Sequence, residues 1–145
     1  MESSNAYASS LELCFCLQEK NAHIRKYVLD HSQLLKKKLT NSDLNVNLNR
    51  LLLNRREAEE QFLPLLGDHD DIEKGVPVCA YDNYGNIYSL TFKKWTNKYY
   101  ILNGDWRSLF QSHKLQKNDT ISMWMFIHSS QSKLCLAIEY EKNEK

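Results

Sequence analysis

The stretch NKYYILNGDWRSLFQSHKLQKNDTISMWMF, residues 97–126, carries the clearest structural pattern in the sequence. Residues 98–103 are rich in aromatic and branched side chains, which favours a strand. Residues 118–128 show the same tendency. Between them, residues 105–115 predict a short helix, because four side chains recur at helical spacing: Trp106, Leu109, Phe110 and His113.

Strand patterns continue on both sides of this stretch. Residues 76–82 (VPVCAYD) and 86–95 (NIYSLTFKKW) flank the turn sequence NYG, which predicts a β-hairpin. Residues 133–141 (KLCLAIEYE) predict a final strand, and residues 36–40 (KKKLT) predict a short early one. The Asn-rich residues 41–49 are expected to form a loop.

A helix is predicted over residues 54–66 (NRREAEEQFLPLL), with Asn54 as its N-cap. We expect Pro64 to end or tighten its last turn. Its buried stripe should consist of Ala58, Phe62 and Leu65 or Leu66. Residues 19–35 show a weak helical pattern. Residues 49–53 are compatible with one further strand. The order of elements predicts a mainly β fold, a small open barrel with two short helices at its ends.

Charge is unevenly distributed along a chain whose formal net charge is only +1. Residues 36–56 hold six cations and one acid, and residues 93–117 again hold six cations and one acid. Between them, residues 57–82 hold eight acids and one cation. Polyanion binding requires a local positive surface, which the two basic segments offer. Solvated surface charge without a partner explains the same pattern.

Composition argues against several classes of protein. The 145 residues fit one domain with a modest tail, and no apolar run is long enough to span a membrane. The N-terminus does not have the pattern of a signal peptide. The cysteines are therefore expected to be reduced thiols of an intracellular protein: Cys14, Cys16, Cys79 and Cys135. The five histidines lack the clustering of a zinc site, so neither a metal nor another cofactor is expected.

The sequence resembles the plant B3 DNA-binding domain over residues 34–141. The resemblance rests on LTNSDLN (39–45), on residues 76–95 and 97–126, and on KLCLAIEYE. An ordered set of side chains carries it: Trp95, Tyr100, Leu102, Trp106, Phe110, Leu115, Asp119 and Trp124. It implies a seven-stranded open pseudobarrel with two helices. Residues 1–33 would then form an N-terminal tail or helical extension, and residues 142–145 a C-terminal tail.

The resemblance also implies two arms that grip the major groove of double-stranded DNA. The N-arm corresponds to residues 42–50 and the C-arm to the turn between Trp95 and Lys98, both within the basic segments. Asn pairs with adenine, and Arg or Lys with guanine. The candidate DNA-binding residues are Asn45, Asn47, Asn49, Arg50, Lys93, Lys94, Thr96, Asn97 and Lys98.

Other cations suit phosphate contact: Lys36, Lys37, Lys38, and Arg55 or Arg56. The alternative for the Asn-rich loop is plain turn propensity.

Five aromatic side chains are assigned to the core, where they would support the arms without touching DNA: Trp95, Trp106, Phe110, Trp124 and Phe126. Two positions depart from the family pattern, which often has glycine where Asp105 and Asn118 stand. Asp and Asn are the non-glycine residues that best tolerate positive φ, so we expect the fold to survive.

These observations favour a nuclear, sequence-specific DNA-binding protein that regulates plant transcription. One alternative is a degenerate B3 fold that binds proteins and little or no DNA. A nuclease is not expected, because the acidic residues Asp68, Asp70, Asp71 and Glu73 lie in a solvated loop without a nucleophile motif. Residues 11–17 (LELCFCL) are similar to the L-x-L-x-L repression motif, which would bind a corepressor; packing on the domain explains them equally well.

Overall fold

The computed structural model describes residues 28–129 and 132–144 of the chain. Helix α2 spans Arg55–Gln61, the 3-10 turn η2 spans Leu63–Leu65, and helix α3 spans Trp106–Ser112. Eight strands form one sheet. Their bounds are β1 Val28–His31, β2 Leu35–Lys38, β3 Leu51–Asn54, β4 Val76–Tyr81, β5 Ile87–Lys94, β6 Tyr99–Gly104, β7 Thr120–His128 and β8 Lys133–Glu141.

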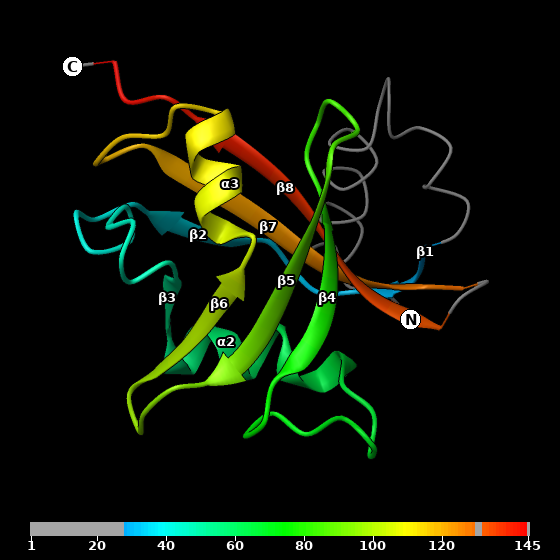
Figure 1. The fold of residues 1–145 in the computed structure, drawn as a ribbon. Helices are drawn as coiled ribbons and strands as arrows, with labels where there is room; N and C mark the ends of the chain where they lie inside the picture. Colours follow the sequence, from blue (N-terminus) through cyan, green and yellow to red (C-terminus); the bar gives the residue numbers. More distant parts are fainter. Residues whose placement is uncertain (1–27, 130–131, 145) are drawn as a thin grey trace.

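The sheet runs in the order β1-β7-β8-β4-β5-β6-β3, and β2 also pairs with β7 (Figure 1). Strands β1 and β2 follow each other along β7, since His31 lies opposite Phe126 and Leu35 opposite Met123. Eight strands therefore fill seven positions. The pair of β4 and β8 is parallel, and the other pairs are antiparallel. The predicted seven-stranded open pseudobarrel is confirmed.

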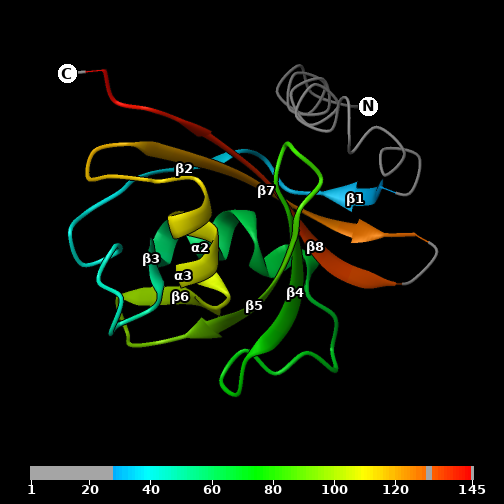
Figure 2. The same ribbon diagram turned by 45° about the horizontal axis from the view of Figure 1, so that its top comes forward.

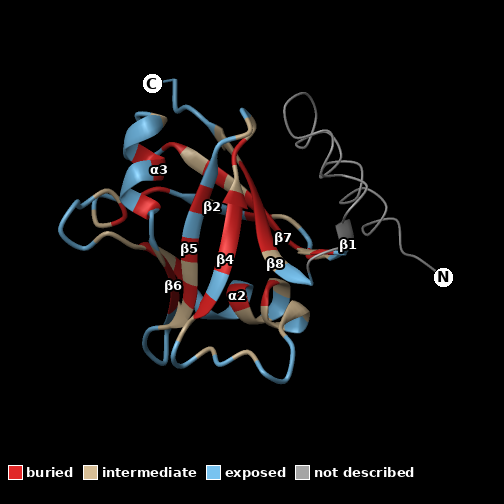
Figure 3. Ribbon diagram, turned by 45° about the vertical axis from the view of Figure 1, so that its right-hand side comes forward, coloured by how far each residue is buried: buried red, intermediate tan, exposed pale blue. Residues whose placement is uncertain are grey.

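The main core lies inside the curved sheet, with one helix at each end of it (Figures 1 and 2). Helix α2 contributes Ala58, and Phe62 follows directly after it; neither is exposed. Helix α3 contributes Trp106, Leu109 and Phe110, as its apolar spacing predicted. The helices thus close the two ends of the barrel, and the loops remain exposed (Figure 3).

The start of α2 follows the sequence-based prediction. The Asn54 side chain accepts hydrogen bonds from the backbone N–H of Arg56 and of Glu57, at 2.9 and 3.3 Å. These bonds satisfy two of the donors that a helix N-terminus leaves unpaired. After Gln61 the chain tightens into η2, which contains Pro64. The predicted cap, the buried Ala58 and Phe62 and the tightening at Pro64 are confirmed, whereas Leu65 and Leu66 are only half-buried.

Two local predictions were wrong. The helix expected over residues 19–35 is absent from the described part of that range, where Val28–His31 forms β1 instead. Pairing with the edge of β7 outweighs weak helix propensity there. The positive φ expected at Asp105 occurs one residue earlier, at Gly104, where φ is +82°. A Cβ on Gly104 would lie 2.7 Å from the Ser89 carbonyl oxygen, so glycine is required at that position. Asn118 does adopt positive φ, at +75°.

The β4–β5 hairpin is joined to the end of α3 through the buried carboxylate of Asp82. It accepts hydrogen bonds from the backbone N–H groups of Tyr84 and Asn86 and from the Tyr88 hydroxyl. The ring nitrogen Nε2 of His113 lies 2.8 Å from Asp82 Oδ2. Burial alone would raise the pKa of Asp82, but the bonds from Asn86, Tyr84 and His113 lower it below its usual value.

This lowered pKa predicts a contribution of Asp82 to acid unfolding. Its ionised form stabilises the fold above about pH 4, and that stability is lost as the pH falls through the lower folded-state pKa. Unfolding free energy measured by urea titration between pH 6 and pH 2 should fall less steeply for Asp82→Asn, by up to about 1.4 kcal/mol per pH unit in the acid window. An unchanged slope would contradict the assignment.

Candidate nucleic-acid interface

The two predicted arms lie at opposite ends of β6. The N-arm, residues 42–50, connects β2 to β3, and its Asn49 Nδ2 donates to the Gly104 carbonyl at the end of β6, at 3.0 Å. The C-arm, residues 93–98, leads from the end of β5 into the start of β6. Both loops lie on the same side of the molecule (Figures 1 and 2). Six strand residues separate their ends by about 17 Å, somewhat more than the major-groove width of about 12 Å.

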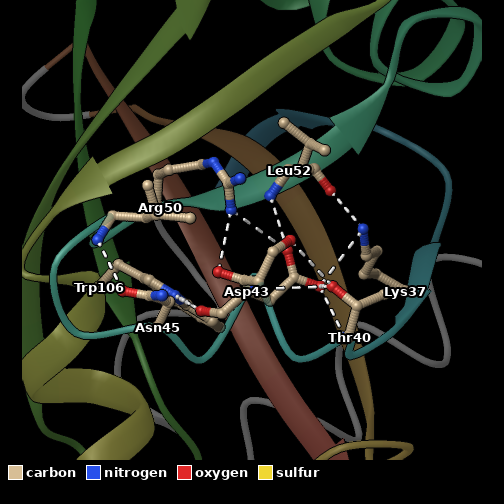
Figure 4. A network of polar contacts seen from close by, with 9 residues as sticks. Lys37, Thr40, Asp43, Asn45, Arg50, Leu52 and Trp106 are labelled. Atoms are coloured by element: carbon tan, nitrogen blue, oxygen red, sulfur yellow. Dashed lines mark hydrogen bonds and ion pairs between the residues drawn. The ribbon is translucent and has the colours of Figure 1, made fainter.

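The N-arm is built around the carboxylate of Asp43, which is fully buried (Figure 4). Its Oδ2 accepts hydrogen bonds from the backbone N–H and the hydroxyl of Thr40, at 2.9 and 3.0 Å. Its Oδ1 accepts one from the Leu52 N–H in β3, at 3.1 Å. The Asp43 carbonyl accepts from the indole Nε1 of Trp106, at 2.7 Å. The carboxylate and the indole thus tie both ends of the loop to the barrel.

Two cations neutralise Asp43. Lys37 Nζ lies 3.4 Å from its Oδ2 and donates to the Leu52 carbonyl, at 2.7 Å. Arg50 Nη1 lies 4.0 Å from its Oδ1 and donates to the Ser42 carbonyl, at 3.1 Å. Both cations are therefore engaged inside the protein. Sequence reasoning assigned Lys37 to phosphate and Arg50 to bases; neither assignment includes this structural role.

The three candidate asparagines of the N-arm differ in what their side chains do. Asn45 Oδ1 accepts from the N–H groups of Asn47 and Leu48, which holds a turn. Asn49 has φ +48°, and its Oδ1 accepts from the Arg107 N–H, at 2.8 Å, so that it caps the start of α3. The exposed Asn47 side chain has no hydrogen-bond partner among the described residues. The positions of Asn45 and Asn49 are therefore explained by the local backbone that they stabilise. The side-chain amide of Asn47 remains available to bind a ligand.

The tip of the N-arm also exposes two apolar side chains that sequence reasoning missed. Val46 is 42% exposed and Leu48 is 50% exposed. Residues 45–48 are all exposed, so both the apolar side chains and the asparagines of the tip face solvent. Apolar side chains in the major groove contact the methyl group of thymine. The tip thus combines amide and apolar chemistry suited to base edges.

The C-arm is a compact turn fixed by backbone bonds. The N–H groups of Trp95 and Thr96 both donate to the Tyr99 carbonyl, and Thr96 Oγ1 accepts from the Lys98 N–H, at 3.0 Å. Arg55 at the start of α2 donates from Nη1 to the Asn97 carbonyl, at 3.0 Å. The turn therefore holds its shape without using the Asn97 and Lys98 side chains.

The other two cations of the C-arm lie on β5. Lys93 is on the outer face of the sheet, opposite Ile101 of β6, and has no ion-pair partner among the described side chains. Lys94 Nζ lies 3.8 Å from Glu73 Oε2. Three C-arm side chains thus remain available for a ligand: Lys93, Asn97 and Lys98.

The assignment of Trp95 to the core was wrong, because its side chain is 57% exposed. Tyr88, Leu90 and Phe92 of β5 are buried, so the alternation of the strand directs odd-numbered positions outward. Period two would have placed Trp95 outside. The other four aromatics assigned to the core are buried, as predicted: Trp106, Phe110, Trp124 and Phe126.

A shallow depression of about 410 Å³ adjoins the C-arm. It is lined by Asn54, Arg55, Arg56, Asn97, Lys98 and Tyr99. Arg55 Nε lies 3.1 Å from Glu59 Oε2, and Arg56 Nε lies 4.0 Å from Glu60 Oε2. These exposed pairs are weak, so a phosphate can compete for the guanidinium groups. On β2, Lys36 and Lys38 are exposed cations without an ion-pair partner within the described residues.

The negative charge of Asp105 is engaged within the fold. Its Oδ2 accepts from the Ser89 N–H, at 2.9 Å, and its own N–H donates to the Ser89 carbonyl.

In the acidic loop, Asp70 and Asp71 accept hydrogen bonds from backbone N–H groups of their own turns. Across residues 28–129 and 132–144, no three His, Cys, Asp or Glu side chains are grouped to hold a metal. No helix in the same residues is long and apolar enough to cross a membrane.

A model of the B3 domain-containing protein At2g31720-like family matches residues 13–142. Putative B3 domain-containing protein At4g03170 of Arabidopsis thaliana is 33% identical over 113 residues, which cover 77% of this chain and 45% of that protein. At3g28853 of the same plant is 33% identical over 96 residues, covering 65% of this chain and 79% of the relative. At4g03160 is 28% identical over 131 residues and is covered over 65% of its length. The chain thus spans less than two thirds of some relatives.

Two solved structures have the same fold. The Arabidopsis FUS3–DNA complex gives a TM-score of 0.53 at 20% identity, covering 76% of this chain and 97% of that chain. The complex of the Arabidopsis thaliana transcription factor LEC2 with DNA gives 0.52 at 23% identity, covering 75% and 96%. These similarities confirm the resemblance from which the fold was predicted.

Proposed function

Because the chain belongs to the B3 domain-containing protein family, we propose that it binds double-stranded DNA sequence-specifically and regulates plant transcription in the nucleus. One observation carries the proposal. The two arms extend from opposite ends of β6 on the same side of the molecule, and each presents an amide or cation that the fold does not use. That arrangement suits insertion of the arms into the major groove.

The nine proposed DNA-binding residues divide by what their side chains already bind. Asn47, Lys93, Asn97 and Lys98 have no side-chain partner among the described residues, so they are proposed to contact DNA directly. Thr96 and Lys94 hold the C-arm or pair with Glu73. Asn45, Asn49 and Arg50 shape the N-arm and reach DNA only through their remaining donors. Base contact is therefore proposed chiefly for Asn47 and Asn97.

Contacts to phosphate are proposed for exposed cations around the arms. Lys36 and Lys38 extend from β2, and Arg55 and Arg56 line the depression beside the C-arm. Such contacts position the protein on the duplex without reading its sequence. Tyr99, 38% exposed, lines the same depression, and the backbone N–H of Trp95, whose side chain is 57% exposed, donates to the Tyr99 carbonyl. Both rings are proposed to pack against the sugar–phosphate backbone.

The proposed DNA-binding unit is residues 34–141, between an N-terminal extension (1–33) and a short C-terminal tail (142–145). Both flanks contact it. Strand β1 pairs with β7, and Lys142 Nζ lies 2.7 Å from the buried Asp119 carboxylate, which also accepts the Asn143 N–H. Residues 28–31 of the extension therefore add a strand to the sheet, and the start of the tail is bound to Asp119, just before β7.

The main alternative is a protein-binding B3 fold with little or no DNA affinity. The internal use of Asn49 and Arg50 and the apolar tip at Val46 and Leu48 favour it. No catalytic role is proposed, because B3 domains are non-enzymatic DNA-binding domains and the acidic loop residues serve their own turns.

Selection from a pool of random-sequence duplexes tests the proposal. The full chain is incubated with the pool, bound DNA is sequenced, and affinity for the enriched site is followed against salt. We expect an enriched short motif and an affinity that falls steeply as salt rises. Absence of binding at low salt, together with a partner protein recovered by the same chain, would support the alternative instead.

Variants of the C-arm should separate base contact from phosphate contact. Asn97→Ala is expected to relax preference at one position of the site and cost about 1–3 kcal/mol on it. Lys98→Ala should weaken binding to all duplexes alike and reduce the salt slope by about one. Lys133→Ala, an exposed cation at the start of β8, is the matched control and should change neither. Uniform loss in Asn97→Ala would remove Asn97 from base contact.

A further inference from the structure

The tip of the N-arm, residues 45–48, carries two of the three large aliphatic side chains that are exposed among the described residues. These two are Val46 and Leu48, and the third is Ile87 at the start of β5. The apolar segment at residues 11–17 lies outside the described residues. Neither Val46 nor Leu48 belongs to a hydrophobic cluster of the described fold. The core of the barrel therefore does not require them, and both are free to contact a ligand.

The backbone of the tip forms a closed turn. Asn45 Oδ1 accepts from the N–H groups of Asn47 and Leu48, and the Asn49 N–H donates to the Asn45 carbonyl, at 3.1 Å. The Asn49 side chain then fastens the end of the turn to the last residue of β6 and to the start of α3. A turn fixed in this way presents its two apolar side chains in one arrangement, which lowers the entropy lost on binding.

The apolar tip lies in cationic surroundings. Arg107 Nη1 lies 3.5 Å from the Val46 carbonyl oxygen, and this exposed arginine has no ion-pair partner among the described side chains. The only acid of residues 42–50 is Asp43, which is fully buried and paired with Lys37 and Arg50. The charge beside the tip therefore favours a polyanion as the ligand.

The chemistry of base edges identifies what an apolar tip would recognise on DNA. Among the groups that bases present in the major groove, the C5-methyl group of thymine is the apolar one. The others are hydrogen-bond donors and acceptors, which lose water without compensation when a valine or leucine covers them. We propose that Val46 and Leu48 are specificity-determining residues that contact the C5-methyl groups of thymine in the major groove. This role rests on the proposed binding of double-stranded DNA.

A protein partner is the other ligand that exposed apolar side chains suit. A stable protein interface buries about 800 Å² on each partner, and two side chains supply only a small part of that area. The groups beside them also differ from the core of a protein interface, because Asn47 offers a free amide and Arg107 a free cation. An amide suits the edge of a base and a guanidinium suits a phosphate, so the tip as a whole favours DNA.

Removal of single methyl groups from the DNA tests this role. The duplex enriched by selection is prepared with each thymine replaced in turn by uracil, which pairs in the same way and lacks only the C5-methyl group. The affinity of the full chain for each duplex is measured by fluorescence anisotropy. We expect uracil at one or two positions to weaken binding about fourfold, the factor for one methyl group that loses an apolar contact.

Variants of the tip assign the lost methyl contact to its side chain. Val46→Ala and Leu48→Ala should each bind the thymine duplex several-fold more weakly and lose the uracil penalty at one position. Both side chains are exposed, so the urea midpoint should stay as in the wild type. Ile87→Ala removes an exposed aliphatic side chain outside the arms and is the matched control. It should keep both the affinity and the uracil penalty of the wild type.

The outcomes distinguish this role from DNA binding itself. Absence of binding to any duplex at low salt would remove both. Binding to an enriched site that tolerates uracil at every position would overturn the role of Val46 and Leu48 and leave DNA binding intact. A uracil penalty that persists in both tip variants would have the same meaning. Unchanged DNA affinity in both variants would also overturn it, because the tip would then serve a different partner.

Discussion

An Asp43→Ala variant is expected to lose about 3–5 kcal/mol of unfolding free energy. The Asp43 carboxylate is fully buried and accepts three hydrogen bonds, from Thr40 and Leu52. Removing it leaves the part-buried N–H of Leu52 unpaired and leaves Lys37 and Arg50 without their common counter-charge. Breaking such a pair is costly because the two remaining cations, 21% and 16% exposed, have lost most of their water.

Urea denaturation followed by tryptophan fluorescence measures this loss. Asp43→Asn is the matched control, since it keeps the shape and one acceptor oxygen but removes the charge. It should fall between the wild type and the alanine variant. A loss below about 1 kcal/mol in Asp43→Ala, the range typical of exposed ion pairs, would contradict the central role of the carboxylate.

The same variant should also separate the shape of the N-arm from its chemistry. Asp43 contacts no proposed DNA-reading group except Arg50, yet it fixes both ends of the loop. If the arm is pre-formed for DNA, the folded fraction of Asp43→Ala should bind its site more weakly and keep the salt slope of the wild type. Pre-organisation lowers the entropy lost on binding without adding a contact.

The sequence predicted the elements of the fold well because their signals are local. The hairpin over 76–95, the cap at Asn54 and the helical spacing from Trp106 to Phe110 each depend on neighbours within one or two turns. The error at Trp95 was one of interpretation. Period two from Phe92 directs it outward, whereas aromatic character alone suggested the core.

The site was harder to predict because its decisive contacts join residues far apart in the chain. The two loops that the resemblance assigned as arms lie within the two basic segments, but the N-arm itself contains one cation, Arg50. The roles of individual side chains within the arms did not follow from the sequence. Asn49 caps a helix that begins at Trp106, and Arg50 forms an ion pair with Asp43. Residue type indicates what a side chain is able to bind. Only the fold shows whether its groups are already occupied.

A Trp106→Ala variant is expected to destabilise the chain by about 3–5 kcal/mol, the range for removal of a buried tryptophan. The Trp106 side chain is 1% exposed and packs on Phe110, with ring centroids 5.6 Å apart. Its indole N–H also donates to the Asp43 carbonyl in the N-arm, so the substitution leaves a cavity under α3 and an unpaired carbonyl together.

Trp106→Phe separates these two effects, because it keeps most of the apolar volume and removes the N–H. We expect it to cost about 1–2 kcal/mol in urea denaturation, part of it from the lost hydrogen bond. Amide chemical shifts should then change in the N-arm, residues 42–50, and stay as in the wild type in the C-arm. Equal shift changes in both arms would mean that Trp106 acts through general packing, and the N-arm would then depend on Asp43 alone.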